Sequence, residues 1–153
     1  MAKWEKIQIN ATTMDKFCCN NNIIPDFIKM DIEGAEYEVL HSLSDELLNK
    51  FRIIVVEFHR LHQLLDRFSF SLMSPAFRKL LRTHAVVHIH PNNVGGVINF
   101  AGVSVPMTME FTFLRRDRLR PTQTRPVYPH PLDHKNVAAK PDVVLPPSWY
   151  QLQ

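Results

Sequence analysis

Three acidic residues stand close together in one short stretch of the chain, which reads FIKMDIEGAE from Phe27 to Glu36. They are Asp31, Glu33 and Glu36. Crowded carboxylates are stabilised by a cation, a proton or a polar ligand, so the stretch is a candidate site. The start of a helix alone favours acids such as Glu33 and Glu36. Asp31 needs a further reason, because aspartate is depleted from strands.

The elements that would position these acids are a strand and a helix. Phe27 to Ile32 is apolar and predicts a buried strand, and apolar residues at helical spacing predict a helix from Ala35 to Lys50. Gly34, between them, allows a tight turn or a close backbone approach. Ligands of open α/β sheets bind at the carboxyl ends of the strands. We therefore expect the three acids at that edge.

A second apolar stretch, Arg52 to Phe58, predicts another buried strand. Glu57 and His59 alternate with Phe58, so both project to one side. His59, at the carboxyl end, is a candidate for accepting a proton from a substrate hydroxyl. The alternative is that Glu57 and His59 pair with each other or with the backbone.

Two further histidines, His88 and His90, share one side of a predicted strand from Ala85 to His90. Asn92 and Asn93 follow, and spacing alone fits a turn as well as substrate contact. A metal-dependent hydrolase using the three groups above (Asp31, Glu57 and His59) together with these histidines is an alternative. Neither a histidine pair at helical spacing nor a cysteine set supports it, so we predict no metal.

The remaining predicted elements complete an α/β order. They are an entry strand at Lys6 to Asn10, a short helix that Thr12 or Thr13 caps and that runs through Asn20, a helix from Pro75 to Thr83 capped by Ser74, and a strand at Met109 to Arg115. Strands that alternate with helices predict an open, mostly parallel sheet. The aromatic residues Phe68, Phe70 and Phe77 are predicted core, and the histidines outside the candidate site, His84 among them, are predicted surface or tail residues.

The composition predicts one α/β domain at residues 1–120 and an extended, proline-rich tail at 121–153. Seven of the 11 prolines lie in the tail, and proline resists helices and sheet ladders. Val143, Val144, Leu145, Trp149 and Tyr150 are candidate anchors for this tail, on the domain or on a second subunit.

The charge pattern and the termini exclude some classes of protein. The net charge of +3 comes from the region after Leu114, where no aromatic interleaving accompanies the arginines, so nucleic-acid binding is not expected. No apolar run has membrane-spanning length, and the first residues are too polar for a signal peptide. These features predict a cytoplasmic protein without a membrane span.

Several ordered motifs resemble the C-terminal half of FkbM-type methyltransferases. They are TTMDKFCCNNNIIPD, FIKMDIEGAEYEVL, IIVVEFH, HIHPNN and PMTMEFTFLRRD, which together cover about residues 8–117. The resemblance implies a class I, Rossmann-like methyltransferase fold with an antiparallel last strand. It also implies S-adenosylmethionine as cofactor and a hydroxyl group of a small molecule or glycan as methyl acceptor.

On this interpretation the candidate residues fall into three roles. Asp31 and His59 are the predicted catalytic residues, and Asp31, Glu33 and Gly34 are predicted to bind the cofactor. The predicted substrate-binding residues are Glu36, Glu57, His88, His90, Asn92 and Asn93.

The sequence departs from the family in lacking a glycine-rich cofactor loop. None of its four glycines precedes Gly34, and no G-x-G occurs. The chain is therefore expected to be a fragment, a degenerate copy or one half of a split enzyme. A non-catalytic remnant or binding module is the alternative function. An unpaired edge at Phe27 to Ile32 predicts a homodimer, aggregation or a second chain that supplies the N-terminal half.

Overall fold

The structure, a computed structural model, describes residues 11–120 and 128–150. Its helices, in chain order, are α1 (Ala11–Asn20), α2 (Glu36–Ser42), α3 (Asp45–Leu48) and α4 (Arg67–Thr83), with 3-10 turns at Leu61–Leu65, Arg116–Arg118 and Pro147–Trp149. Its strands are β1 (Phe27–Met30), β2 (Ile53–Phe58), β3 (His84–Pro91), β4 (Val97–Phe100), β5 (Val103–Pro106) and β6 (Met109–Arg115). The predicted entry strand at Lys6 to Asn10 lies outside the described residues.

Four strands form the main sheet in the order β1-β2-β6-β3. β1 and β2 are parallel, and β6 runs antiparallel to both of its neighbours, β2 and β3. Phe58 at the end of β2 and Pro91 at the end of β3 both lie opposite Met109. The carboxyl ends of β1, β2 and β3 thus meet at one edge of the sheet, as the sequence predicts for the candidate residues.

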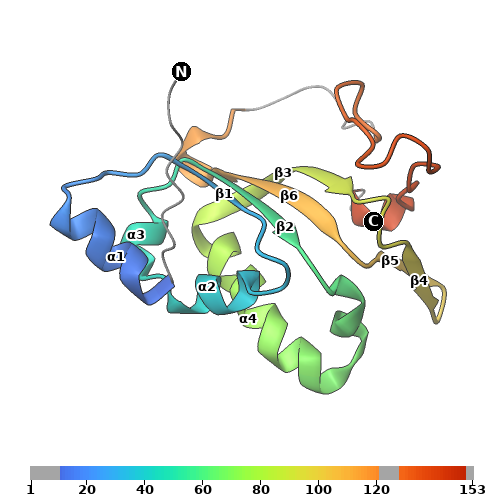
Figure 1. The fold of residues 1–153 in the computed structure, drawn as a ribbon, viewed down its shortest axis with the longest axis horizontal. Helices are drawn as coiled ribbons and strands as arrows, with labels where there is room; N and C mark the ends of the chain where they lie inside the picture. Colours follow the sequence, from blue (N-terminus) through green and yellow to red (C-terminus); the bar gives the residue numbers. More distant parts are fainter. Residues whose placement is uncertain (1–10, 121–127, 151–153) are drawn as a thin grey trace.

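The helices lie on one side of the sheet in the view of Figure 1, and residues 128–150 lie near β3 and the β4–β5 hairpin. Ile54, Val56 and Phe58 alternate with more exposed residues along β2 and are almost fully buried. Phe58 packs against Phe77 of α4 and, edge to face, against Phe111 of β6, with ring centroids 4.4 and 5.5 Å apart. This aromatic group joins the helical layer to the sheet.

β1 is an edge strand in the described sheet, and it is shorter and more exposed than the sequence predicts. The strand ends at Met30 rather than Ile32, and Phe27 is 56% exposed. An apolar run was a poor guide here, because only Ile28 and Met30, on one face of the strand, pack on the core, whereas Phe27 and Lys29 on the other face are exposed. The predicted association through this edge stays a prediction, which light scattering of the purified chain would test.

Two helix predictions are wrong in their bounds. The single helix predicted from Ala35 to Lys50 is broken at Leu43, where ψ is 138°, and Ser44 then caps α3 by accepting from the Leu47 amide at 3.0 Å. The helix predicted to begin at Pro75 begins eight residues earlier, at Arg67. Asp66 caps it, because its carboxylate accepts from the Ser69 amide at 2.8 Å.

Other predictions fail for reasons of burial. Phe77 is packed in the core, but Phe68 and Phe70 are exposed on the first turns of α4. His84, predicted at the surface, is fully buried and bonds through Nε2 to the Phe51 carbonyl at 3.0 Å. Burial lowers the pKa of His84.

The start of the first helix also differs from the prediction. The first described helix begins at Ala11, so Thr12 and Thr13 are not its cap.

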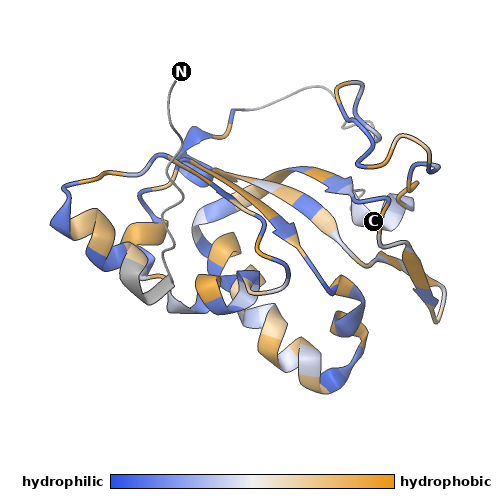
Figure 2. Ribbon diagram, viewed as in Figure 1, coloured by the Kyte–Doolittle hydropathy of each residue, from blue (hydrophilic) through white to orange (hydrophobic). Residues whose placement is uncertain are grey.

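The β4–β5 hairpin is an element that the sequence did not predict. Its residues are largely hydrophobic in Figure 2, and Ile98, Phe100 and Val103 are exposed. The tail contacts the hairpin near its turn, where Trp149 Nε1 donates to the Ser104 carbonyl at 2.9 Å. In the described part of the chain, no helix has both the length and the apolar character needed to cross a bilayer.

The tail packs on the domain through some of its predicted anchors. Leu145 is buried in the main core, and Trp149 and Tyr150 are packed against that core. Val144 is not an anchor, because its side chain is 78% exposed. Tyr128 joins the tail contacts, with its ring centroid 4.7 Å from that of Tyr150.

Candidate functional site

Asp31, Glu57 and His59 meet where β1 and β2 end, and we call them the Asp31 cluster. Asp31 follows β1, whereas Glu57 and His59 lie at and just beyond the end of β2. A ligand atom of each residue lies within 4.8 Å of the other two. The cluster forms because parallel strands bring their carboxyl ends to the same edge. It brings the Asp31 carboxylate to Glu57 and His59, which lie 26 and 28 residues further along the chain.

Glu36, predicted to bind substrate, lies behind this cluster as a fully buried side chain. Its Oε1 accepts from His59 Nδ1 at 3.0 Å and from the amides of Ile32 at 3.1 Å and Gly34 at 3.0 Å. Its Oε2 has no hydrogen-bond partner among the described residues. Glu36 thus positions both the His59 imidazole and the loop that follows β1.

The contact with Glu36 fixes which face His59 offers to the site. Nδ1 points to Glu36, so Nε2 points to the other acids, 3.5 Å from Glu33 Oε2 and 3.9 Å from Asp31 Oδ1. The Tyr37 hydroxyl donates to the His59 carbonyl at 2.9 Å. Burial raises the pKa of Tyr37, and the Glu36 charge adds to this rise, so the phenol stays a donor. The end of β2 is therefore held at both its backbone and its side chain.

The loop between β1 and α2 has a left-handed backbone at Glu33 and Gly34, with φ of 58° and 107°. A Cβ atom on Gly34 would lie 3.2 Å from Nε of Arg60. The space left by this glycine is thus taken by the Arg60 guanidinium. Glu33, predicted to bind the cofactor, is strongly exposed beside the cluster.

Glu57 is the acid of the Asp31 cluster that is bonded to Asn92, just beyond β3. Burial raises its pKa, and the nearby Asp31 carboxylate raises it further, whereas a hydrogen bond from Asn92 and the charge of His59 oppose the rise. The Asn92 amide donates to Glu57 Oε1 at 2.6 Å, and its carbonyl accepts from the Val94 amide at 2.8 Å. Asn92 therefore both closes a turn and contacts the site, which combines the two roles that its spacing left open.

His88 and His90 face the site from β3 and hold the tail. His88 Nε2 lies 2.9 Å from Asp133 Oδ1, and His90 Nδ1 lies 3.5 Å from Asp133 Oδ2. His90 Nε2 is 3.1 Å from the His134 carbonyl. We call His88, His90 and Asp133 the Asp133 clasp.

A cavity of about 320 Å³ lies between the Asp31 cluster and the Asp133 clasp. Its lining is almost wholly polar: Lys29, Asp31, Glu57, His88, His90, Asn92, Glu110, Leu132, Asp133, His134 and Asn136. Five residues assigned from the sequence are thus brought to one cavity, and His59 adjoins it. Asn93 is not among them, because its buried side chain bonds to the tail, donating to the Val137 carbonyl and accepting from the Val137 amide at 2.9 Å each.

The sequence interpretation missed two contributions to this cavity. The tail supplies Asp133 and its neighbours, and the Lys29–Glu110 pair, 3.1 Å between Nζ and Oε2, also lines the cavity. Lys29 and Glu110 alternate with buried residues on β1 and β6, which is a readable strand signal. Asp133 carries no such signal, because it is in a turn far along the chain.

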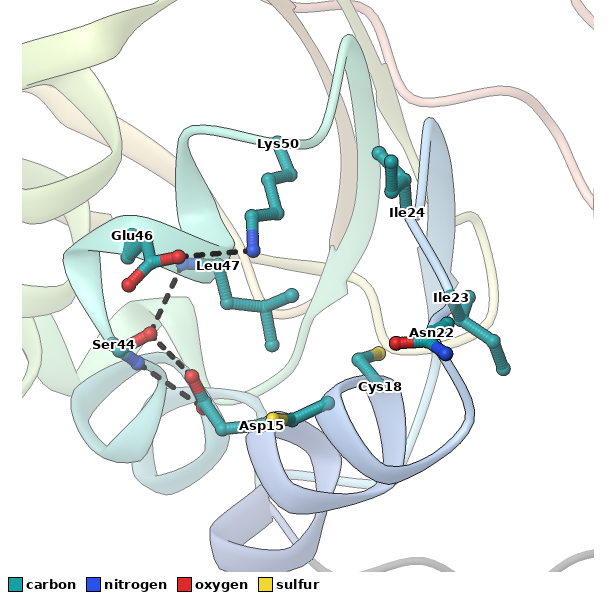
Figure 3. A pocket seen from close by; sticks show the side chains of 10 residues that line it. Asp15, Cys18, Asn22, Ile23, Ile24, Ser44, Glu46, Leu47 and Lys50 are labelled. Atoms are coloured by element: carbon teal, nitrogen blue, oxygen red, sulfur yellow. Dashed lines mark hydrogen bonds and ion pairs between the residues drawn. The ribbon is translucent and has the colours of Figure 1, made fainter.

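A second cavity, of about 430 Å³, lies beside α1 and α3 at the amino end of β1 (Figure 3). Cys18 and Cys19 line it and are free thiols. Its charged groups are already paired: Asp15 bonds to Ser44, and Glu46 lies 3.0 Å from Lys50. No residue assigned from the sequence lies there, and the amino ends of strands are the wrong edge for ligands in such sheets.

The fold is a mixed α/β domain, with acids and an imidazole at the edge of the sheet where open α/β sheets bind their ligands. The family model described as "Methyltransferase FkbM domain" matches residues 4–92, which is more than half of the chain. The chain therefore belongs to the FkbM methyltransferase family. Neither the curated proteins nor the solved structures include a match.

The matched region includes the Asp31 cluster and stops at the end of β3. The family resemblance read from the sequence is thus confirmed. β6 and the tail, which complete the cavity, lie outside the match.

Proposed function

We propose that this chain takes part in S-adenosylmethionine-dependent methyl transfer to a hydroxyl group of a small molecule or glycan, on a Rossmann-like fold. Family membership supports methyl transfer in general. The observation that carries the proposal further is the Asp31 cluster, where an imidazole is held by a buried carboxylate at the edge of a polar cavity.

The acids at this edge suit one end of the cofactor. S-Adenosylmethionine supplies a methyl group on a positively charged sulfonium, next to a cationic amine. Asp31 and the exposed Glu33 are the described residues that would face such charges. Gly34 does not add a cradle for a nucleotide, because the Arg60 guanidinium fills the space beside it.

The acceptor hydroxyl needs to lie in line with the methyl group and to lose its proton. His59 is placed for this role, because Nδ1 donates to Glu36 and leaves the Nε2 lone pair facing the cavity edge. Asp31, beside Nε2, would stabilise the imidazolium that forms. Glu57, Asn92, His88 and His90 would then hydrogen-bond the rest of a hydroxyl-rich acceptor.

Calorimetric titration with S-adenosylhomocysteine, the demethylated cofactor, tests the proposal. We expect heat from the wild-type chain and at least tenfold weaker binding for Asp31→Asn and Glu33→Gln. Glu46→Gln, an acid to amide change on α3, is the matched control and should bind like the wild type. No heat at millimolar ligand would leave the binding-module alternative in its place.

Activity is tested separately from binding. Release of S-adenosylhomocysteine, measured by mass spectrometry in the presence of a panel of sugars and other small polyols, should depend on His59. His59→Ala should lower the rate about 100-fold or more, as expected for loss of a general base. A His59→Ala chain as fast as the wild type would remove the imidazole from the mechanism.

A further inference from the structure

We propose that Asp31, Glu57 and His59 form a binding site for one divalent transition-metal cation, with Mn²⁺ as the best-suited ion. The proposal concerns cation binding and holds whether or not the chain transfers a methyl group. It departs from the sequence interpretation, which weighed a metal and predicted none.

The ligand set and its spacing carry the first step. One imidazole nitrogen and two carboxylate oxygens lie within 4.8 Å of one another, and His59 Nε2 is 3.9 Å from Asp31 Oδ1. Adjacent ligand atoms around an ion at about 2.1 Å lie roughly 3 Å apart, so the groups need to move inward by about 1 Å. Asp31 is 45% exposed and both carboxylates line the polar cavity, so neither side chain is packed into the core. Carboxylates with one imidazole favour Mn²⁺ over Ca²⁺, which prefers oxygen ligands alone.

The second step rests on Glu36, which is independent of the three ligands. A histidine that binds a metal through one nitrogen typically donates its other N–H to a carboxylate. His59 Nδ1 makes this contact with Glu36 Oε1 at 3.0 Å, and the same oxygen is anchored by two backbone amides. Glu36 is fully buried and its Oε2 has no partner in the part of the chain that the structure describes. The imidazole is thus oriented by a buried carboxyl group, with its free nitrogen toward two more acids.

The charge around the cluster is the third step. Four acids surround His59. Its ring nitrogens lie within 3.9 Å of carboxylate oxygens of Asp31, Glu33 and Glu36, and Glu57 belongs to the Asp31 cluster. Two basic side chains are near, and among the described residues neither forms an ion pair with these four acids. Lys29 pairs with Glu110 at 3.1 Å, and the Arg60 guanidinium lies against Gly34. A divalent cation between the acids would offset a charge that neither neighbour neutralises.

A cation would change what His59 can do. Metal and proton compete for the same lone pair on Nε2, so His59 can serve as a base only in the metal-free site. In the loaded site a coordinated hydroxyl would instead become more acidic through the cation itself. Metal binding and methyl transfer can therefore be tested apart from each other.

The test is a titration of the metal-stripped full chain with Mn²⁺, followed by electron paramagnetic resonance of the free ion. We expect one bound Mn²⁺ per chain and at least tenfold weaker binding for Asp31→Asn and His59→Ala. Glu36→Gln should weaken binding by about 10- to 100-fold, because it alters the support of His59 without removing a ligand. Electron spin echo spectra of bound Mn²⁺ should show coupling to an imidazole nitrogen, and His59→Ala should abolish it.

The matched controls are Asp133→Asn, on the far side of the same cavity, and Glu46→Gln on α3, and both should bind Mn²⁺ like the wild type. Circular dichroism checks that each variant is folded, and the exposed Asp31 makes Asp31→Asn the safest of them. No bound Mn²⁺ at millimolar concentration, or equal binding by the wild type and the Asp31→Asn variant, would overturn the proposal. The titration with S-adenosylhomocysteine in chelator separates this result from a failure of the proposed function.

Discussion

The two sides of the polar cavity are built in different ways. The Asp31 cluster joins the ends of two neighbouring strands and is held from behind by Glu36, which lies near Asp31 in the sequence. The Asp133 clasp joins β3 to a turn of the tail, across 45 residues. The first side depends on the sheet and the second on the docking of a segment with little regular structure. Changes to one side should therefore leave the other intact, unless they reach the core that both share.

The largest expected effect breaks both sides together. Phe58→Ala removes the ring that packs between Phe77 and Phe111, and it opens a hole where β2 meets β6. We expect a loss of about 3–5 kcal/mol in the free energy of unfolding, measured by urea denaturation. Phe68→Ala, on the exposed turn of α4, is the control and should change it by about 0.5 kcal/mol at most. A small loss for Phe58→Ala would mean that the two sides do not share this core.

A change at Glu36 should affect the Asp31 cluster alone. Glu36→Ala leaves two backbone amides and His59 Nδ1 without their acceptor, which costs about 1–3 kcal/mol. Nitrogen-15 spectra of the His59 ring should change, whereas those of His88 and His90 should not. Equal changes in all three rings would contradict the separation of the two sides.

Asn93→Ala should loosen the tail and spare the Asp31 cluster. The Asn93 amide makes paired hydrogen bonds with the backbone of Val137, and their loss costs about 1–2 kcal/mol. Hydrogen exchange at the Val137 amide should become faster, while exchange in β2 stays the same. Asn49→Ala, an exposed amide after α3, is the control. Unchanged exchange at Val137 would show that other contacts hold the tail.

The smallest effect is the pH dependence of the Asp133 clasp. Burial raises the pKa of Asp133, but the His130 amide and the charges of His88 and His90 lower it more, so its pKa lies below the ordinary 3.8. Its contribution is therefore complete above pH 3.8 and is lost as the pH falls through the lower folded value. We expect Asp133→Asn to cost up to about 1 kcal/mol at neutral pH and nothing at the acid end. The measurement is urea denaturation of both proteins across the acid range. A difference in the free energy of unfolding between the wild type and Asp133→Asn that persists at the lowest pH would contradict this role of the Asp133 carboxylate.

The Asp31 cluster could be predicted because its signals are local. Each of its strands is an apolar run that ends in a charged residue, and the carboxyl ends of parallel strands share an edge. Its support by Glu36 was not predicted, since burial of an acid depends on how α2 packs, which spacing does not reveal. Asp133 could not be found at all, because only the folded chain brings it to His88.

Two secondary-structure predictions failed because the residues at a turn and at a helix start gave misleading signals. The β4–β5 hairpin turns at Ala101 and Gly102, whose φ angles are 48° and 80°. Such turns usually carry Asn-Gly, so an alanine there hides the signal. Pro75 suggested a helix start because proline favours the first turn, yet it lies inside α4. The cap at Asp66 was the better signal.

The place of β6 in the sheet bears on how the protein is made. Among the described strands this one comes last along the chain, but it lies third in the sheet, between β2 and β3. During synthesis, β1, β2 and β3 therefore leave the ribosome before the strand that joins them exists, and an apolar surface waits uncovered until Met109–Arg115 has emerged. Long-range pairing of this kind slows folding. A nascent chain halted before β6 should be the species that a chaperone retains.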